Sequence, residues 1–180
     1  MPTYVPRLTA PSTSDPLYYS NMNPYQATGW GMPNCTAYAW GRAWELTGGL
    51  TGTYPTGVPL DGYHNAEYWY PSSPDGWPRG QTPQLGAIAC YAGGDFQGVG
   101  HVCVLERDNG DNTWLVSESA LNGYTFRATH SIAANGDYGY GNYTFQGFIY
   151  VPWTGGGGSG GNFPWWLARK IIFKKRGLIL

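Results

Sequence analysis

The sequence has little charge, few cysteines and no long apolar run. Only 12% of its 180 residues are charged, whereas 17% are aromatic, the reverse of the composition of disordered chains. No uncharged apolar stretch is long enough to span a bilayer. The opening stretch MPTYVPRLTAPSTSDP has neither a basic nor an apolar segment, so we expect no signal peptide. These absences favour one folded, loop-rich domain with its own core.

Cysteine is scarce, and the three that are present cannot form a closed disulfide framework, because one must stay unpaired. A disulfide between Cys90 and Cys103 is one alternative, and a small buried thiol at Cys103 is the other. No Cys/His cluster has zinc-ligand spacing, and no Asp-rich segment resembles a calcium loop. We therefore expect no metal and no cofactor, and the odd thiol directs attention to catalysis.

Lysine is absent from residues 1–161, where five arginines face eleven acidic residues, a net charge of −6. Residues 162–180 contain five cations and no acid, a net charge of +5. GGGGSGG at 155–161 reads as a flexible linker, either natural or engineered. We therefore expect a domain over 25–154 followed by a separate basic tail, and no nucleic-acid partner.

The N-terminal half has helical signals and the C-terminal half has strand signals. Residues 1–24 are rich in Pro, Ser, Thr and Tyr without a period and predict an extended arm. A helix is predicted after Asn34, a plausible cap, with a stop at Gly48. A second, short helix is predicted over 63–70, before Pro71.

Four β-branched or aromatic runs follow, separated by turn-forming segments, and they predict strands. A Gly/Tyr-rich loop at 135–143 is expected at the edge of their sheet. Helices followed by an antiparallel sheet define an α+β domain, with the N-terminal helices packed on the sheet. The predicted strands are 85–92, 100–107, 113–120 and 145–152.

Cys35 stands where the predicted helix begins, and the partial positive charge of a helix N-terminus favours an anion there. The alternative is a small buried residue that happens to start a helix. His101 begins a predicted strand, and a hairpin turn over 107–113 places Glu118 opposite residues 101–103, beside His101. A thiol, a base and a group that orients the base are the parts of a nucleophilic site. His64 and His130 lie outside this pattern and are expected at the surface or at a helix end.

Six segments stand in the order and spacing of one known family: NCTAYAWGRA, HNAEYW, TPQLGAIACY, GHVCVLE, SESALNG and FQGFIYVP. Together they resemble a CHAP domain, the cysteine, histidine-dependent amidohydrolase/peptidase family. The resemblance spans roughly 25–152 and implies a papain-like α+β fold with peptidoglycan as the partner. It also implies hydrolysis of a peptidoglycan amide bond, by an N-acetylmuramoyl-L-alanine amidase or an endopeptidase.

Carried over by this resemblance, Cys35 corresponds to the nucleophile, His101 to the general base and Glu118 to its orienting group. Asn34 stands where the family often has Gln, and with the Cys35 N–H it is a candidate oxyanion donor. The family commonly has Asn where this chain has Ala120, so Asn122 becomes a candidate fourth polar group.

Many CHAP domains belong to phage endolysins, so the resemblance favours a phage lysin made in the host cytoplasm and released to the wall, or a virion-borne enzyme. We expect a monomer. The alternative is a non-catalytic wall-binding module on the same fold. The tail is either a passive extension or an attachment to anionic envelope polymers or a membrane surface. Its candidate binding residues are Trp165, Trp166, Arg169, Lys170, Lys174, Lys175 and Arg176.

Overall fold

The computed structural model describes residues 4–49, 51, 65–72, 76–94 and 97–153. The predicted linker and basic tail lie outside the described residues, as does His64. None of the helices in the described part is long and apolar enough to cross a membrane. The elements are α1 (Pro16–Tyr19), α2 (Pro24–Ala27), α3 (Cys35–Thr47), the 3-10 helix η1 (Ala66–Tyr68), β1 (Arg79–Gly80), β2 (Ile88–Gly93), β3 (His101–Asp108), β4 (Thr113–Glu118), β5 (Arg127–Ala133) and β6 (Tyr143–Ile149).

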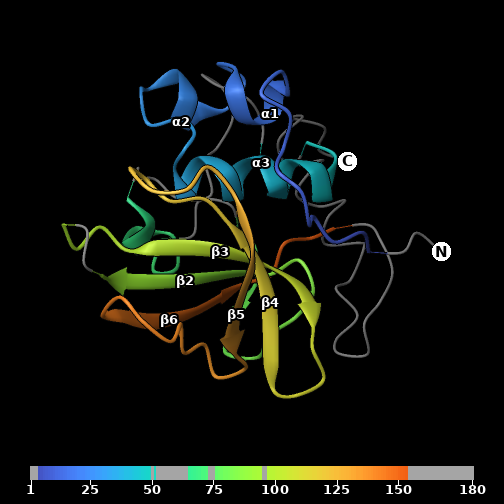
Figure 1. Ribbon diagram of the computed structural model, residues 1–180, viewed down its shortest axis with the longest axis vertical. Coiled ribbons are helices and arrows are strands. Elements are labelled where there is room, and N and C mark those ends of the chain that lie inside the picture. Colours follow the sequence, from blue (N-terminus) through green and yellow to red (C-terminus); the bar gives the residue numbers. More distant parts are fainter. Residues whose placement is uncertain (1–3, 50, 52–64, 73–75, 95–96, 154–180) are drawn as a thin grey trace, which may run out of the picture.

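The six strands form one antiparallel sheet in the order β1-β6-β2-β3-β4-β5. The helices α1, α2 and α3 lie on one side of it, with α3 next to the strands (Figure 1). The steep angle of β4 and β5 to β2 and β3 reflects the twist of the sheet (Figure 1). The α+β expectation, with N-terminal helices packed on an antiparallel sheet, is confirmed.

The predicted bounds of α3 are confirmed by both of its caps. The Asn34 side chain accepts a hydrogen bond from the Thr36 N–H at 3.0 Å, which satisfies one of the free donors of the first turn. At the other end, Gly48 has φ +62°, the left-handed conformation that closes a helix.

The extended arm predicted over 1–24 is wrong for residues 16–19, which form α1. Asp15 caps this helix by accepting from the Leu17 N–H at 3.0 Å, and Pro16 starts it. Tyr18 is fully buried against α3. A Cβ at Gly41 would lie 2.7 Å from the Tyr18 ring, so this glycine permits the close approach of α1 to α3. The N-terminal segment is therefore part of the core.

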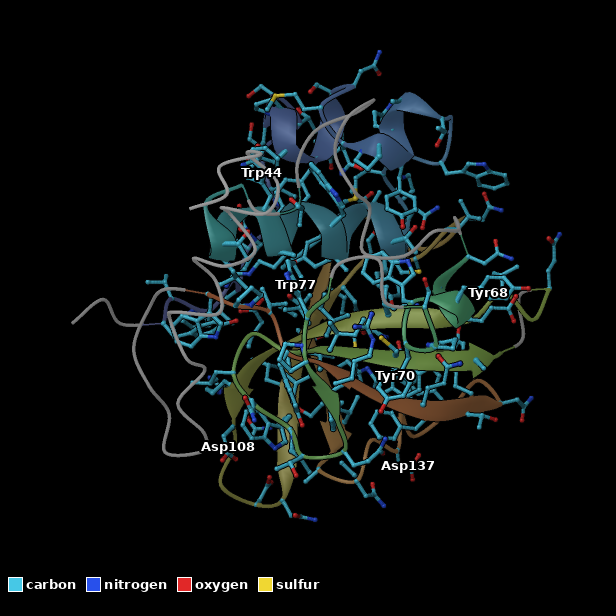
Figure 2. All side chains as sticks on the ribbon, turned by 180° about the vertical axis from the view of Figure 1, so that it is seen from behind. Trp44, Tyr68, Tyr70, Trp77, Asp108 and Asp137 are labelled. Carbon is cyan, nitrogen blue, oxygen red and sulfur yellow. The ribbon has the colours of Figure 1, made fainter. Side chains whose placement is uncertain are left out.

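The sheet separates two hydrophobic clusters. Val102 and Val104 face the helices with Trp77, which Figure 2 shows between α3 and the sheet. Cys103 and Leu105 point to the other face. Alternation along a strand produces this division.

Cys90 and Cys103 do not form a disulfide, and all three cysteines are free. Cys90 pairs across the strands with Val102 and belongs to the cluster on the helix side, whereas Cys103 belongs to the opposite cluster. Their side chains thus leave the sheet in opposite directions. Cys103 is the small buried thiol that was the other alternative.

Two strands are absent from the sequence-based prediction, and one helix is shorter than predicted. β1 has only two residues, and β5 buries only Ile132, so neither has a strong hydrophobic pattern. Of the helix predicted over 63–70, the described part forms η1 alone.

Candidate active site

Cys35 is the first residue of α3 and is 9% exposed. Asn34, which precedes it, is buried and has its side-chain oxygen occupied by Thr36, through the backbone N–H at 3.0 Å and the hydroxyl at 2.9 Å. The cap fixes the first turn, and the thiol sits where backbone N–H groups and the helix dipole favour negative charge.

His101 and Glu118 form a buried pair on adjacent strands. Nε2 of His101 lies 2.6 Å from Oε2 of Glu118, and both side chains are buried. The β3–β4 hairpin carries them together in the register expected from its turn, with a bulge after Leu105. Because Nε2 is engaged by Glu118, Nδ1 is the ring nitrogen left for Cys35.

The electrostatics of the site favour a charged histidine. Burial alone would lower the pKa of His101, but a hydrogen bond and charge interaction with Cys35, followed by those with Glu118, raise it to about 10. Burial would likewise raise the pKa of Glu118, but hydrogen bonds from His101 and His130 hold it well below its usual range. Glu118 is therefore an anion beside an imidazolium.

The residue directly before His101, Gly100, has to be a glycine. Its φ is +79°, and a Cβ there would lie 2.3 Å from the Tyr91 carbonyl oxygen and 2.6 Å from the Glu67 nitrogen. Glu67 belongs to η1, so only a glycine lets this turn lie against the start of β3. The position of His101 thus depends on a close backbone approach.

Glu118 has further partners that sequence reasoning missed. Tyr138 donates to Oε2 at 2.6 Å, and Arg127 donates to Oε1 from Nε at 2.9 Å and from Nη2 at 2.5 Å. Nδ1 of His130 lies 3.2 Å from the same oxygen. The expectation for His130 is therefore wrong, because this residue is half-buried beside the carboxylate.

Asn122 does not reach this network. It is an exposed residue with φ +57° in the turn between β4 and β5, so the structure does not place it as a fourth polar group. Asn-Gly is the strongest short hairpin signal. A hairpin centred on Asn122 and Gly123 pairs Glu118 with Arg127, which is the observed register. That signal could have revealed β5 and its side chains.

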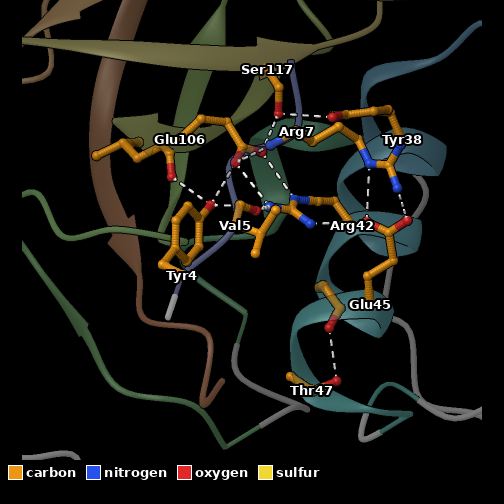
Figure 3. Close-up of polar contacts among 11 residues, drawn as sticks. Tyr4, Val5, Arg7, Tyr38, Arg42, Glu45, Thr47, Glu106 and Ser117 are labelled. Atoms are coloured by element: carbon orange, nitrogen blue, oxygen red, sulfur yellow. Dashed lines mark hydrogen bonds and ion pairs between the residues drawn. The ribbon is translucent and has the colours of Figure 1, made fainter. Parts of the chain in front are cut away.

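A second polar network holds α3 on the sheet (Figure 3). Arg42 of α3 donates to both carboxylate oxygens of Glu106, at 3.0 and 2.9 Å. Glu106, on β3, also accepts from Ser117 of β4 at 2.6 Å and from the Tyr4 hydroxyl at 2.6 Å. Tyr38 of α3 donates to Ser117 at 2.8 Å. These bonds connect the helix that carries Cys35 to the strands that carry His101 and Glu118.

Within the described ranges, no group of three or more His, Cys, Asp or Glu residues could hold a metal ion. The site has a buried imidazole–carboxylate pair and a thiol whose interaction with His101 raises the pKa of that histidine. Such a set can form a nucleophile, transfer a proton and orient the base.

Comparison with known proteins supplies the family. The CHAP domain model matches residues 23–120, which include Cys35, His101 and Glu118. The chain belongs to the CHAP domain family. The match confirms the resemblance drawn from the sequence and, with the observed layers, the papain-like α+β fold.

Two further similarities accompany this match. A probable autolysin LDP from Staphylococcus aureus (strain NCTC 8325 / PS 47) is 33% identical over 111 residues, which cover 59% of this chain and 34% of that protein. A crystal structure of an N-acetylmuramoyl-L-alanine amidase from Staphylococcus aureus has 22% identity and a TM-score of 0.44, covering 67% of this chain and 32% of the other. The chain thus spans about a third of the length of each of these two proteins.

Proposed function

We propose that this chain is a peptidoglycan hydrolase that cleaves an amide bond with a Cys35 thiolate. The observation that carries the proposal is the buried contact between His101 and Glu118, together with the Cys35 interaction that raises the pKa of His101. The name of the autolysin, 33% identical over 111 residues, supports the wall as the substrate. The bond is that of an N-acetylmuramoyl-L-alanine amidase or an endopeptidase.

The proposed reaction has two steps. The Cys35 sulfur attacks the amide carbonyl, the S–C bond forms, the C–N bond breaks, and His101 gives its proton to the leaving amine. Neutral His101 then takes a proton from water, whose oxygen attacks the thioester carbonyl; the C–S bond breaks, the acyl group leaves as a carboxylic acid, and the Cys35 thiolate and His101 imidazolium are restored. The Cys35 N–H and the Asn34 side-chain NH2 are the proposed oxyanion donors, since Oδ1 of Asn34 is occupied by Thr36.

One observation favours a non-catalytic wall-binding module on this fold instead. Ala120 is apolar and Asn122 is exposed, so the turn after β4 supplies no fourth polar group. A binding module would retain sacculi without cutting them.

Digestion of purified Gram-positive sacculi separates the two functions. We expect turbidity to fall, and mass spectrometry of the released fragments to show new amino termini without new reducing sugar ends. The position of the new amine identifies the bond. Cys35→Ser should keep the fold and lose cleavage. Cleavage by that variant at the wild-type rate would rule out the proposed nucleophile.

We also propose a wall location for the activity, reached either as a phage lysin released from the host cytoplasm or as a virion-borne enzyme. The family resemblance supports this origin, whereas the probable autolysin LDP is a bacterial relative. The origin and a monomeric state stay predictions.

A further inference from the structure

The Glu118 carboxylate is held from two sides by different elements. Oε2 faces His101 and Tyr138, each at 2.6 Å. Oε1 faces β5, where Arg127 donates twice and His130 lies at 3.2 Å. The Glu118 side chain is fully buried, so each oxygen depends on these groups instead of water.

Arg127 is itself fixed. It lies opposite Glu118 in the β4–β5 register, and its guanidinium stacks over the Tyr124 ring at 4.4 Å from the centroid. Nη2 also donates to the Tyr138 hydroxyl at 3.1 Å and to the Tyr140 hydroxyl. A guanidinium held by rings and hydroxyls presents its N–H groups in one orientation.

We propose that Arg127 is the positioning residue of this site and holds Glu118 so that Oε2 faces His101. The carboxylate cannot turn Oε2 away without giving up two charge-assisted hydrogen bonds on Oε1. The inference rests on the proposed hydrolase function. It assigns to a residue of β5 the polar contact with the site that neither Ala120 nor Asn122 provides.

The direction of the His101 pKa shift on removing Arg127 distinguishes the proposal from a simple charge effect. A cation near Glu118 repels the His101 imidazolium, so removing that charge alone would raise the pKa of His101. If Arg127 holds the carboxylate, its removal lets Glu118 move away and lowers the pKa of His101. The two explanations therefore predict opposite shifts.

The other titratable groups around Glu118 do not change the expected direction of the His101 pKa shift. The pKa values of Cys103, Tyr91 and Tyr124 are raised, in each case first by burial and then by neighbouring charges. These groups therefore stay neutral while His101 titrates. The remaining charged and titratable neighbours are Arg127, which the variants change, and Cys35, His130 and Tyr138, which they keep.

The test is a titration of His101 by NMR of histidine-labelled protein. The chain has only three histidines, His64, His101 and His130, and a His101→Phe variant identifies the resonance. In Arg127→Gln we expect the His101 midpoint to fall by about one pH unit or more, in the same direction as in Glu118→Gln. Turnover on sacculi should fall with it, through kcat more than KM.

Two further variants make the outcome decisive. Arg127→Lys keeps the charge and loses the planar fork, so it should also lower the midpoint, and it decides the matter if the Gln variant fails to fold. Arg107→Gln removes the same charge from an exposed site on β3 and should shift nothing. An unchanged or raised midpoint in the Arg127 variants would overturn the proposal. Absence of sacculus cleavage by the wild type would instead overturn the proposed function, because the titration needs no substrate.

Discussion

The raised pKa of His101 makes the stability of the folded chain depend on pH. Its pKa in the folded chain is about 10, above the ordinary 6.5, so folding favours the protonated form. This stabilisation is fully present below about pH 6.5 and is lost as pH rises from there to about 10. The raised pKa depends on the Cys35 interaction first and on Glu118 next.

We therefore expect the free energy of unfolding in urea to decline between pH 6.5 and 10. In Glu118→Gln the imidazolium has lost its carboxylate, so the part of the decline due to His101 should end at a lower pH. Asp111→Asn, which removes a carboxylate from an exposed turn, is the matched control and should follow the wild type. Parallel wild-type and Glu118→Gln curves would show that Glu118 does not hold the charge on His101.

At the scale of elements, the contact between η1 and β3 predicts the effect of a single methyl group. Gly100→Ala should destabilise the domain by about 1–3 kcal/mol more than Gly98→Ala, and it should lower sacculus cleavage by displacing His101. Both glycines have positive φ, but a Cβ at Gly98 meets nothing within 4 Å, whereas at Gly100 it meets backbone. Thermal unfolding and cleavage rates measure the difference. Equal losses of stability in the two variants would show that the close backbone approach is not what requires a glycine at position 100.

The ion pair between Arg42 of α3 and Glu106 of β3 gives a second prediction at this scale. Arg42→Met should cost about 3–5 kcal/mol in urea unfolding, because it leaves the buried Glu106 carboxylate without its cation. Arg107→Met, at an exposed position, should change stability by about 0.5 kcal/mol or less. A small effect at Arg42 would mean that Ser117, Tyr4 and the Arg7 backbone N–H satisfy the Glu106 carboxylate without a cation.

The sequence predicts elements well where local signals and burial agree. Asn34 and Gly48 mark both ends of α3, and the turn after β3 brings His101 to Glu118. β5 was missed because only Ile132 is buried along it, although Asn122-Gly123 marks its hairpin. α1 was missed because it is one turn long, although Asp15-Pro16 is a cap followed by a helix-starting proline. The Arg127 contact follows from register, which composition does not reveal.

At the scale of the whole molecule, Trp153 is the last described residue and still packs on the domain. Its Nε1 donates to the Leu85 carbonyl oxygen at 3.0 Å, and its ring lies 4.9 Å from that of Tyr4. Truncation after this residue therefore removes the basic tail and no described contact. We expect unchanged cleavage of soluble muropeptides and weaker binding to whole cells, most clearly at low salt.

A salt series measures the proposed role of the tail. The full chain should approach the truncated form as salt screens the +5 tail. Equal cell binding by both forms at every salt concentration would show a passive extension.

The most direct measurement of the central claim is alkylation of the native protein with iodoacetamide, mapped by mass spectrometry. Cys35 is 9% exposed, whereas Cys90 and Cys103 are fully buried, and burial first of all raises the pKa of Cys103. The two buried thiols are therefore internal controls. We expect one label, on Cys35, and loss of sacculus cleavage in proportion to it. Undiminished cleavage by protein fully labelled at Cys35 would contradict the account.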